Sequence, residues 1–170
     1  GMIVGLHTIQ QGAADISDDI ASVFGIRRAQ AERLKCFHGS ALSTPRDHQE
    51  VLDVGTDEES PALGNGPRIT RAQLNSVICQ RVDMIIAEVS SALKAMGFGG
   101  TTGHQIVLTG GGAELKGIAE HMQASLGRTV RIGRPMGISG IPEAHSGPAF
   151  STLMGLVRYA ASDPIDMKYG

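Results

Sequence analysis

The chain has 170 residues, of which 23 are glycine, with 4% aromatic residues and a formal net charge of −2. This low charge and the few aromatic side chains disfavour nucleic-acid binding. The two cysteines, Cys36 and Cys79, lack the spacing of a zinc site and are compatible with buried thiols in a reducing cytoplasm. No apolar stretch reaches the ~20 residues that a membrane helix needs, so we expect a cytoplasmic protein.

The first elements are a strand followed by two helices. Residues 3–9 are rich in β-branched residues that alternate loosely, which predicts a strand. Asp15 is expected to cap a helix that stops at Gly25. A second helix is predicted over residues 27–37.

Residues 40–69 differ in composition from the segments on either side. Between Asp47 and Glu59 there are six acidic residues and no basic one, and glycine and proline recur as far as residue 67. This pattern predicts a solvated loop between short strands at residues 50–54 and 68–69; the alternative is a charged surface for a partner.

The clearest helix signal begins at Thr70. Thr70 and Gln73 form a capping box, and apolar residues recur at three- and four-residue spacing until Gly97. Strands are predicted at residues 104–109 and 129–133, joined by a helix over residues 113–126. After a glycine- and proline-rich loop, a last apolar helix is expected at residues 149–161. These elements predict an α/β fold.

Three consecutive glycines are the main candidates for binding chemistry. Gly110, Gly111 and Gly112 lie between a predicted strand and a predicted helix, where glycine lets the backbone approach a ligand and helix N–H groups favour an anion. A tight turn without a ligand would also need glycine. Leu115 stands where a dinucleotide-binding fingerprint requires glycine, and no Lys-Ser/Thr pair follows as in a P-loop. No histidine pair has metal-site spacing, so we expect no metal site.

The order of several motifs resembles a known family. GAADISDDIASVFGI at 12–26, AERLK at 31–35, VLTGGGAELKGI at 107–118, VRIGRP at 130–135 and GPAFSTLMGLVRYA at 147–160 follow one another along nearly the whole chain. This series resembles the C-terminal half of the FtsA family of bacterial cell-division proteins, most of all the alphaproteobacterial form. The family belongs to the superfamily of actin, heat-shock chaperones and sugar kinases.

The resemblance implies an actin-like, ribonuclease-H-like fold. Residues 1–39 and 97–162 would be parts of the large subdomain 2A, residues 40–96 an inserted small α/β subdomain 2B, and residues 163–170 a tail. The chain begins Gly-Met, which is typical of a cleaved tag, so we expect it to be about half of a longer protein.

The resemblance also implies a nucleotide site. Gly110, Gly111 and Gly112 would line the adenine and α-phosphate of ATP, while Glu32 and Lys35 would reach the ribose hydroxyls or the base edge. The alternative is an i, i+3 ion pair between Glu32 and Lys35 on a solvated helix face. The parent protein would bind ATP with magnesium; without the superfamily's upstream phosphate-binding motifs, this piece is expected to bind ATP weakly or not at all and to be inactive. The sequence departs from the pattern of the resembled family at the Gln11-Gly12 pair and at Asp18. Both departures weaken a role for this segment on the phosphate side of the nucleotide.

Partners follow from the resemblance as well. The parent would link FtsZ filaments to the inner membrane, recruit other divisome proteins and polymerise. The FtsZ C-terminal peptide would contact residues 40–96, where Arg68, Arg71 and Arg81 are available to an acidic peptide. The protein would lie on the cytoplasmic face of the membrane through a segment absent from this chain. Alternatives are a pilus-assembly or chaperone-like ATPase of the same superfamily, or an unrelated α/β nucleotide-binding enzyme.

Overall fold

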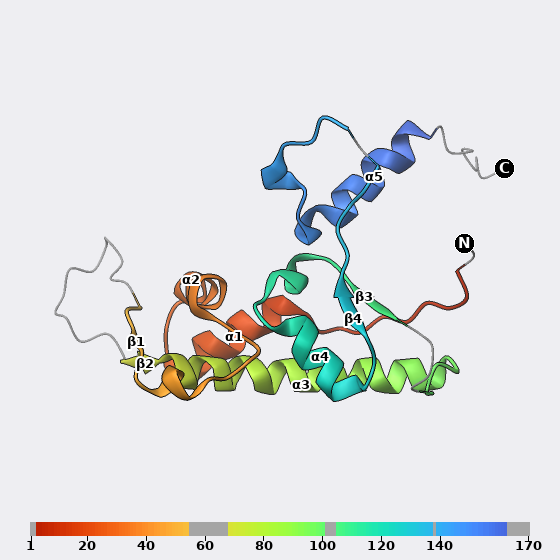
Figure 1. Ribbon diagram of the computed structural model, residues 1–170. Helices are drawn as coiled ribbons and strands as arrows, with labels where there is room; N and C mark the ends of the chain where they lie inside the picture. Colours follow the sequence, from red (N-terminus) through yellow and green to blue (C-terminus); the bar gives the residue numbers. More distant parts are fainter. Residues whose placement is uncertain (1–2, 55–67, 101–104, 138, 163–170) are drawn as a thin grey trace.

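The long helix α3, Arg71–Ala95, runs along the body of the computed structural model, and most other elements pack on one side of it (Figure 1). The structure describes residues 3–54, 68–100, 105–137 and 139–162. The predicted cap of α3 is confirmed, because Thr70 Oγ1 accepts a hydrogen bond from the backbone N–H of Gln73. The helix ends just before Gly97, whose φ of 83° no other residue type adopts easily.

Helices α1, Ala13–Phe24, and α2, Arg28–His38, lie across α3. The prediction that Asp15 caps α1 is wrong by three residues. Helix α1 already begins after Gly12, and the Asp15 carboxylate accepts a hydrogen bond from the Gly12 N–H at 2.6 Å. Asp15 therefore closes the first turn from inside the helix.

Helix α2 ends where the backbone passes very close to α3. A Cβ at Gly39 would lie 2.5 Å from the carbonyl oxygen of Lys35 and 2.7 Å from Cδ1 of Ile78. Only glycine fits here without movement of the backbone or of α3.

A buried polar cluster fixes the loop that follows α2. Asn75 on α3 is fully buried; its Oδ1 accepts from the Ser40 N–H at 2.9 Å, and its Nδ2 donates to Asp47 at 3.1 Å. Asp47 lies in the short 3-10 helix η1, Pro45–His48, and backbone and side-chain hydrogen bonds from Thr44 lower the pKa of Asp47. These bonds satisfy the buried polar groups of the loop.

The described strands form two small sheets. Strand β1, Val51–Leu52, pairs antiparallel with β2, Ile69–Thr70, close to the predicted positions. Strand β3, Ile106–Leu108, pairs parallel with β4, Val130–Ile132, and helix α4, Ile118–Leu126, connects them. The predicted β-α-β unit is thus confirmed.

The helix predicted from residue 113 begins later. Gly111–Glu114 form the 3-10 helix η2, and α4 starts only after Gly117, which has a φ of 74°. The left-handed backbone at Gly117 interrupts the helix and redirects the chain.

The strand predicted at residues 3–9 is absent from the structure. This segment has no hydrogen-bonded strand neighbour among the described residues, and Ile3, Val4 and Leu6 are 79 to 88% exposed. Because a strand is stabilised by pairing and by cover on its apolar face, the sequence pattern alone does not form one here.

The C-terminal part continues through η3, Glu143–His145, and η4, Pro148–Phe150, into the predicted last helix, α5, Ser151–Ala161. Helix α5 stands away from α3 (Figure 1). None of its side chains is buried, and Leu156 is 61% exposed.

One continuous apolar core crosses the predicted subdomain limits. It includes buried side chains of α1, α2, β1, β2, α3, α4 and β4. The division into 2A and 2B therefore stays a prediction. The acidic loop over residues 55–67 and the tail at 163–170 lie outside the described residues. Among the helices that are described, none combines the length and apolar character needed to cross a bilayer.

Candidate functional site

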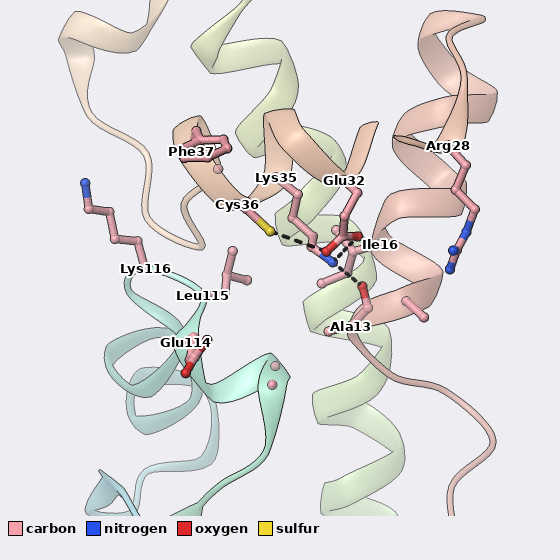
Figure 2. A pocket seen from close by; sticks show the side chains of 14 residues that line it. Ala13, Ile16, Arg28, Glu32, Lys35, Cys36, Phe37, Glu114, Leu115 and Lys116 are labelled. Carbon is pink, nitrogen blue, oxygen red and sulfur yellow. Dashed lines mark hydrogen bonds and ion pairs between the residues drawn. The ribbon is translucent and has the colours of Figure 1, made fainter. Parts of the chain in front are cut away.

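A pocket of about 710 Å³ opens where the first turns of α1, the exposed side of α2 and the segment from Gly111 to Lys116 meet (Figure 2). Its wall combines small residues, a few apolar side chains and several charged groups. The lining residues are Ala13, Ala14, Ile16, Arg28, Glu32, Lys35, Cys36, Phe37, Gly39, Gly111, Gly112, Glu114, Leu115 and Lys116.

Four of the five predicted nucleotide-site residues lie around this pocket. Glu32 and Lys35 come from α2, and Gly111 and Gly112 from η2, about 80 positions further along the chain. Gly110 is not among the lining residues. Its φ of 90° and the hydrogen bond from its N–H to the Pro148 carbonyl, at 3.0 Å, give it the role of shaping the turn.

Gly111 and Gly112 differ in whether the packing around them requires glycine. A Cβ at Gly112 would lie 3.2 Å from Cβ of Ala13, so α1 packs tightly against this position. A Cβ at Gly111 would meet no protein atom within 4 Å, and its backbone is outside the left-handed region. The fold therefore gives no reason for glycine at 111, where the missing side chain leaves the pocket open.

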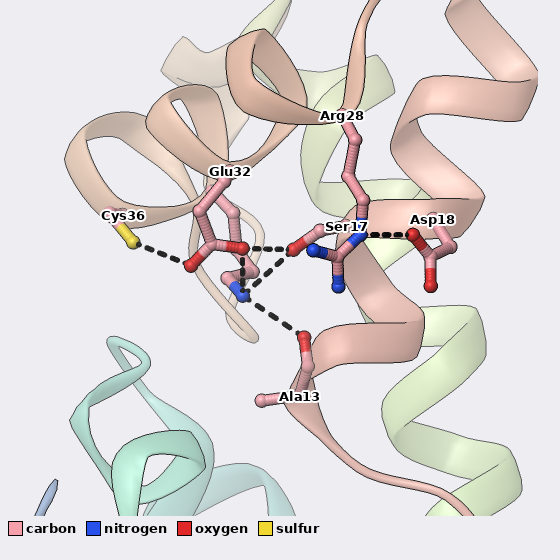
Figure 3. A network of polar contacts seen from close by, with 7 residues as sticks. Ala13, Ser17, Asp18, Arg28, Glu32 and Cys36 are labelled. Atoms are coloured by element: carbon pink, nitrogen blue, oxygen red, sulfur yellow. Dashed lines mark hydrogen bonds and ion pairs between the residues drawn. The ribbon is translucent and has the colours of Figure 1, made fainter.

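Glu32 and Lys35 are held in a network that links α2 to α1 (Figure 3). Lys35 Nζ donates to Oε2 of Glu32 at 2.8 Å, to Oγ of Ser17 at 2.8 Å and to the Ala13 carbonyl at 3.0 Å. The Ser17 hydroxyl donates to the same Oε2 of Glu32. The pair is thus more than an i, i+3 ion pair on a solvated face, because Lys35 is only 11% exposed and is tied to α1.

The network sets the charge state of Glu32. Partial burial would by itself raise the pKa of this carboxyl group, but hydrogen bonds from Lys35, Ser17 and Cys36 outweigh that effect and lower the pKa from 4.5 to about 2. Burial and the bond to Glu32 raise the pKa of the Cys36 thiol. At neutral pH the pocket therefore presents an ionised carboxylate next to a protonated thiol.

The remaining charges of the pocket are mixed. Arg28 Nε is paired with Asp18 at 2.5 Å, so Asp18 makes an ion pair across α1 and α2. Glu114 and Lys116 lie on the opposite wall. Within the described residues no cluster of three or more histidine, cysteine, aspartate or glutamate side chains could hold a metal ion.

Sequence reasoning missed Ser17. This serine lies one turn after Ala13 on the buried side of α1, flanked by the buried Ile16 and Ile20. Its position between two core residues was the available signal, since a buried hydroxyl needs a hydrogen-bond partner on a neighbouring element.

Two of the three arginines predicted to meet an acidic peptide are engaged inside the structure. Arg81 donates from Nε and Nη2 to both carboxylate oxygens of Asp19 on α1, at 2.6 and 2.7 Å. Arg71 donates to Glu50 at 2.7 Å and to the His38 carbonyl at 3.2 Å. Arg68 is exposed. Ten residues of helix place Arg81 roughly 15 Å along α3 from Arg71, so the three do not form one patch. Their contact with a partner stays a prediction.

The Gln11 side chain is directed to α3 and does not line the pocket. Its Nε2 donates to Glu88 at 2.6 Å, and its Oε1 accepts from Arg81 at 3.2 Å. Gln11 thus attaches the start of α1 to α3.

Comparisons of the sequence with known proteins identify its family. The family model described as "Cell division protein FtsA" matches residues 1–155. Among curated proteins, the cell division protein FtsA of Rhizobium meliloti is 35% identical over 164 residues, 94% of this chain and 36% of the relative. FtsA of Escherichia coli K12 is 34% identical over 155 residues, 85% of this chain and 35% of the relative. FtsA of Borreliella burgdorferi is 32% identical over 151 residues, 87% of this chain and 35% of the relative.

The chain spans about a third of the length of these relatives, less than the half expected from its sequence. The match to the alphaproteobacterial protein agrees with the resemblance noted in the motifs. A pilus-assembly or chaperone-like ATPase and an unrelated nucleotide-binding enzyme are thereby set aside. The matched range and the identity over most of the chain show that it belongs to the FtsA family of bacterial cell-division proteins.

Proposed function

We propose that this chain forms part of an actin-like, ATP-binding cell-division protein, and that the pocket between α1, α2 and η2 holds the adenosine of ATP. The observation that carries the proposal is the juxtaposition of the ionised Glu32 carboxylate with the side-chain-free backbone of Gly111 and Gly112. These residues come from separate elements and meet at one pocket.

The pocket suits a nucleoside in size and chemistry. Its volume of about 710 Å³ falls within the range of roughly 300–1,000 Å³ that is common for small-ligand sites. A carboxylate only accepts hydrogen bonds, and ribose hydroxyls can donate them, so Glu32 suits the sugar. The open space beside Gly111 leaves room for the base or the α-phosphate. Arg28 and Lys116 add positive charge at the wall. Magnesium would come with the ATP phosphates, and we assign it no ligand here.

The partner part of the proposal rests on family membership. FtsZ linkage through its C-terminal peptide, recruitment of other divisome proteins, self-association and a location on the cytoplasmic face of the inner membrane are proposed for the complete protein. We propose that the acidic FtsZ peptide contacts Arg68 and the end of α3 next to β1 and β2. Arg81 is left out of this surface because it is paired with Asp19.

An NMR titration with ATP tests the nucleotide site even if binding is weak. Amide signals of Gly111, Gly112 and Glu32 are expected to shift with saturable dependence on ATP concentration. Gly111→Val should abolish these shifts by filling the pocket, and the Cβ of the new side chain meets no protein atom within 4 Å. The amide spectrum of the variant without ATP checks that the fold is kept. Gly100→Val is the matched control, since a Cβ at Gly100 also meets nothing within 4 Å, away from the pocket. Equal ATP affinity in both variants would refute the site.

A separate titration tests the partner proposal. The FtsZ C-terminal peptide should bind saturably to the chain, and Arg68→Ala should weaken binding. Because Arg68 is exposed, its removal should leave the fold intact. Absence of binding to a folded chain would count against the assignment of this surface.

A further inference from the structure

Ser17 occupies the centre of the polar network beside the pocket (Figure 3). Its side chain has no exposed surface. A lysine ammonium carries only donors, so the Ser17 hydroxyl accepts from Lys35 Nζ and directs its single proton to Oε2 of Glu32. The direction of both hydrogen bonds is therefore fixed by the chemistry of the partners.

Lys35 is held by acceptors of the protein. Its Nζ lies within 3.0 Å of Oε2 of Glu32, Oγ of Ser17 and the Ala13 carbonyl. An ammonium group carries only donors, so all three contacts are hydrogen bonds that Lys35 donates. They fix Lys35 beside Glu32, where its side chain is only 11% exposed.

The two oxygens of Glu32 are unequally occupied. Oε2 accepts from both Ser17 and Lys35, whereas Oε1 accepts from the weak donor Cys36 Sγ at 3.3 Å. The Glu32 side chain is 48% exposed. Oε1 is therefore the oxygen with accepting capacity on the pocket side.

We propose that Ser17 is a positioning residue which, with the Lys35 ammonium, fixes Oε2 of Glu32 so that Oε1 faces a ligand that carries a hydroxyl group. The ligand part rests on the function proposed above and names the vicinal hydroxyls of a ribose as the group recognised. Lys35 contributes to this orientation through its hydrogen bond to Oε2 of Glu32.

Other charges around Glu32 cannot replace this arrangement. On α2, Arg28 is paired with Asp18 and Cys36 is a neutral thiol; from the η2 side, Glu114 and Lys116 lie across the pocket. None of these groups donates to Oε2. The orientation of the carboxylate thus depends on the two donors that reach across from α1 and along α2.

A matched pair of substitutions tests the role of the hydroxyl. Ser17→Thr keeps the hydroxyl and adds a methyl group. Ser17→Val introduces a side chain with the shape of threonine but with a methyl group in place of the hydroxyl. Any cost of the added methyl group is common to both, so their difference reports the hydroxyl. Ser22→Ala, at an exposed position of the same helix, serves as the surface control.

The first measurement follows the Glu32 carboxyl carbon by NMR as the pH is lowered, without any nucleotide. Loss of one donor to a carboxylate should move the Glu32 titration in Ser17→Val upward by about one pH unit. Ser17→Thr and Ser22→Ala should titrate as the unmodified chain does. Equal titration of Glu32 in the threonine and valine variants would overturn the positioning role.

The second measurement is ATP affinity at neutral pH. Ser17→Val is expected to bind about tenfold more weakly than Ser17→Thr. A displaced Glu32 titration with equal ATP affinity would overturn the ligand part alone. Absence of any ATP-dependent shift in the unmodified chain would instead count against the proposed function, and the nucleotide-free titration would still decide the role of Ser17.

Discussion

Replacing Arg81 with alanine separates two roles for this side chain: an internal tie between helices and a free surface cation. Arg81 makes a bidentate contact with Asp19 on α1 and a third hydrogen bond to Gln11. The side chains of Arg81 and Asp19 are 20 and 31% exposed. Arg81→Ala would leave the Asp19 carboxylate without its cation and the Gln11 amide without one partner.

The loss of stability expected for Arg81→Ala is set by two reference values, one for exposed ion pairs and one for hydrogen bonds to charged groups. Exposed pairs contribute about 0.2–1 kcal/mol, whereas hydrogen bonds to charged groups contribute roughly 1.5–3 kcal/mol. The partial exposure lets water reach Asp19 after the substitution, so we expect Arg81→Ala to lower the free energy of unfolding by about 2 kcal/mol. Arg68→Ala, at an exposed position, should change it by less than ~0.5 kcal/mol.

Urea denaturation of both variants at neutral pH measures the difference. A double-mutant cycle with Asp19→Ala then isolates the coupling, which should exceed ~0.5 kcal/mol for residues in direct contact. If Arg81→Ala is as stable as Arg68→Ala, the tie to Asp19 contributes nothing and Arg81 is free to meet a partner. That result would refute the reasoning and restore the surface interpretation.

Three further perturbations test other parts of the fold. Gly39→Ala should lower the free energy of unfolding by about 1–3 kcal/mol, measured by thermal denaturation, because the new Cβ meets the backbone and α3. Gly155→Ala is the control, because its Cβ faces open space and should not lower the free energy of unfolding. Asn75→Ala should lower the urea midpoint, equivalent to roughly 1–3 kcal/mol, because the Ser40 N–H and the buried Asp47 carboxylate each lose a hydrogen-bond partner. An unchanged midpoint would contradict this role. The low pKa of Glu32 means that the unfolded chain takes up a proton there first, so stability falls as the pH drops from 4.5 towards about 2. Glu32→Gln should remove that part of the pH dependence when urea midpoints are compared at about pH 5 and about pH 3.

The sequence was sufficient for elements whose signals are local. The capping box at Thr70, the apolar spacing of α3 and the left-handed glycines all act within a few residues, so the helices, apart from the start of α4, were predicted near their true ends. The β-α-β unit followed from the same kind of signal. For the pocket, the resemblance to the FtsA family implied that Glu32 and Lys35 face Gly110, Gly111 and Gly112, and the structure places all of these except Gly110 around one cavity.

What the sequence could not determine depends on groups far apart along the chain. The segment at residues 3–9 has a strand-like pattern, yet pairing decides whether a strand forms, and no described strand pairs with it. Arg81 was indistinguishable from a soluble surface arginine until Asp19, 62 positions away, was seen to bind it. Ser17 lies in the motif at 12–26, but nothing in that motif assigns it a partner, and only the packing of α1 on α2 brings its hydroxyl to Glu32.

The motifs of this chain therefore indicated its family and most of its helices, and the resemblance to that family indicated which residues gather at the pocket. The tertiary structure decided what each polar group does there. A side chain's type fixes how many hydrogen bonds it can donate or accept, but packing selects the partners. For Lys35 that selection supplies three acceptors from the protein itself, and Oε1 of Glu32 is left to face the pocket.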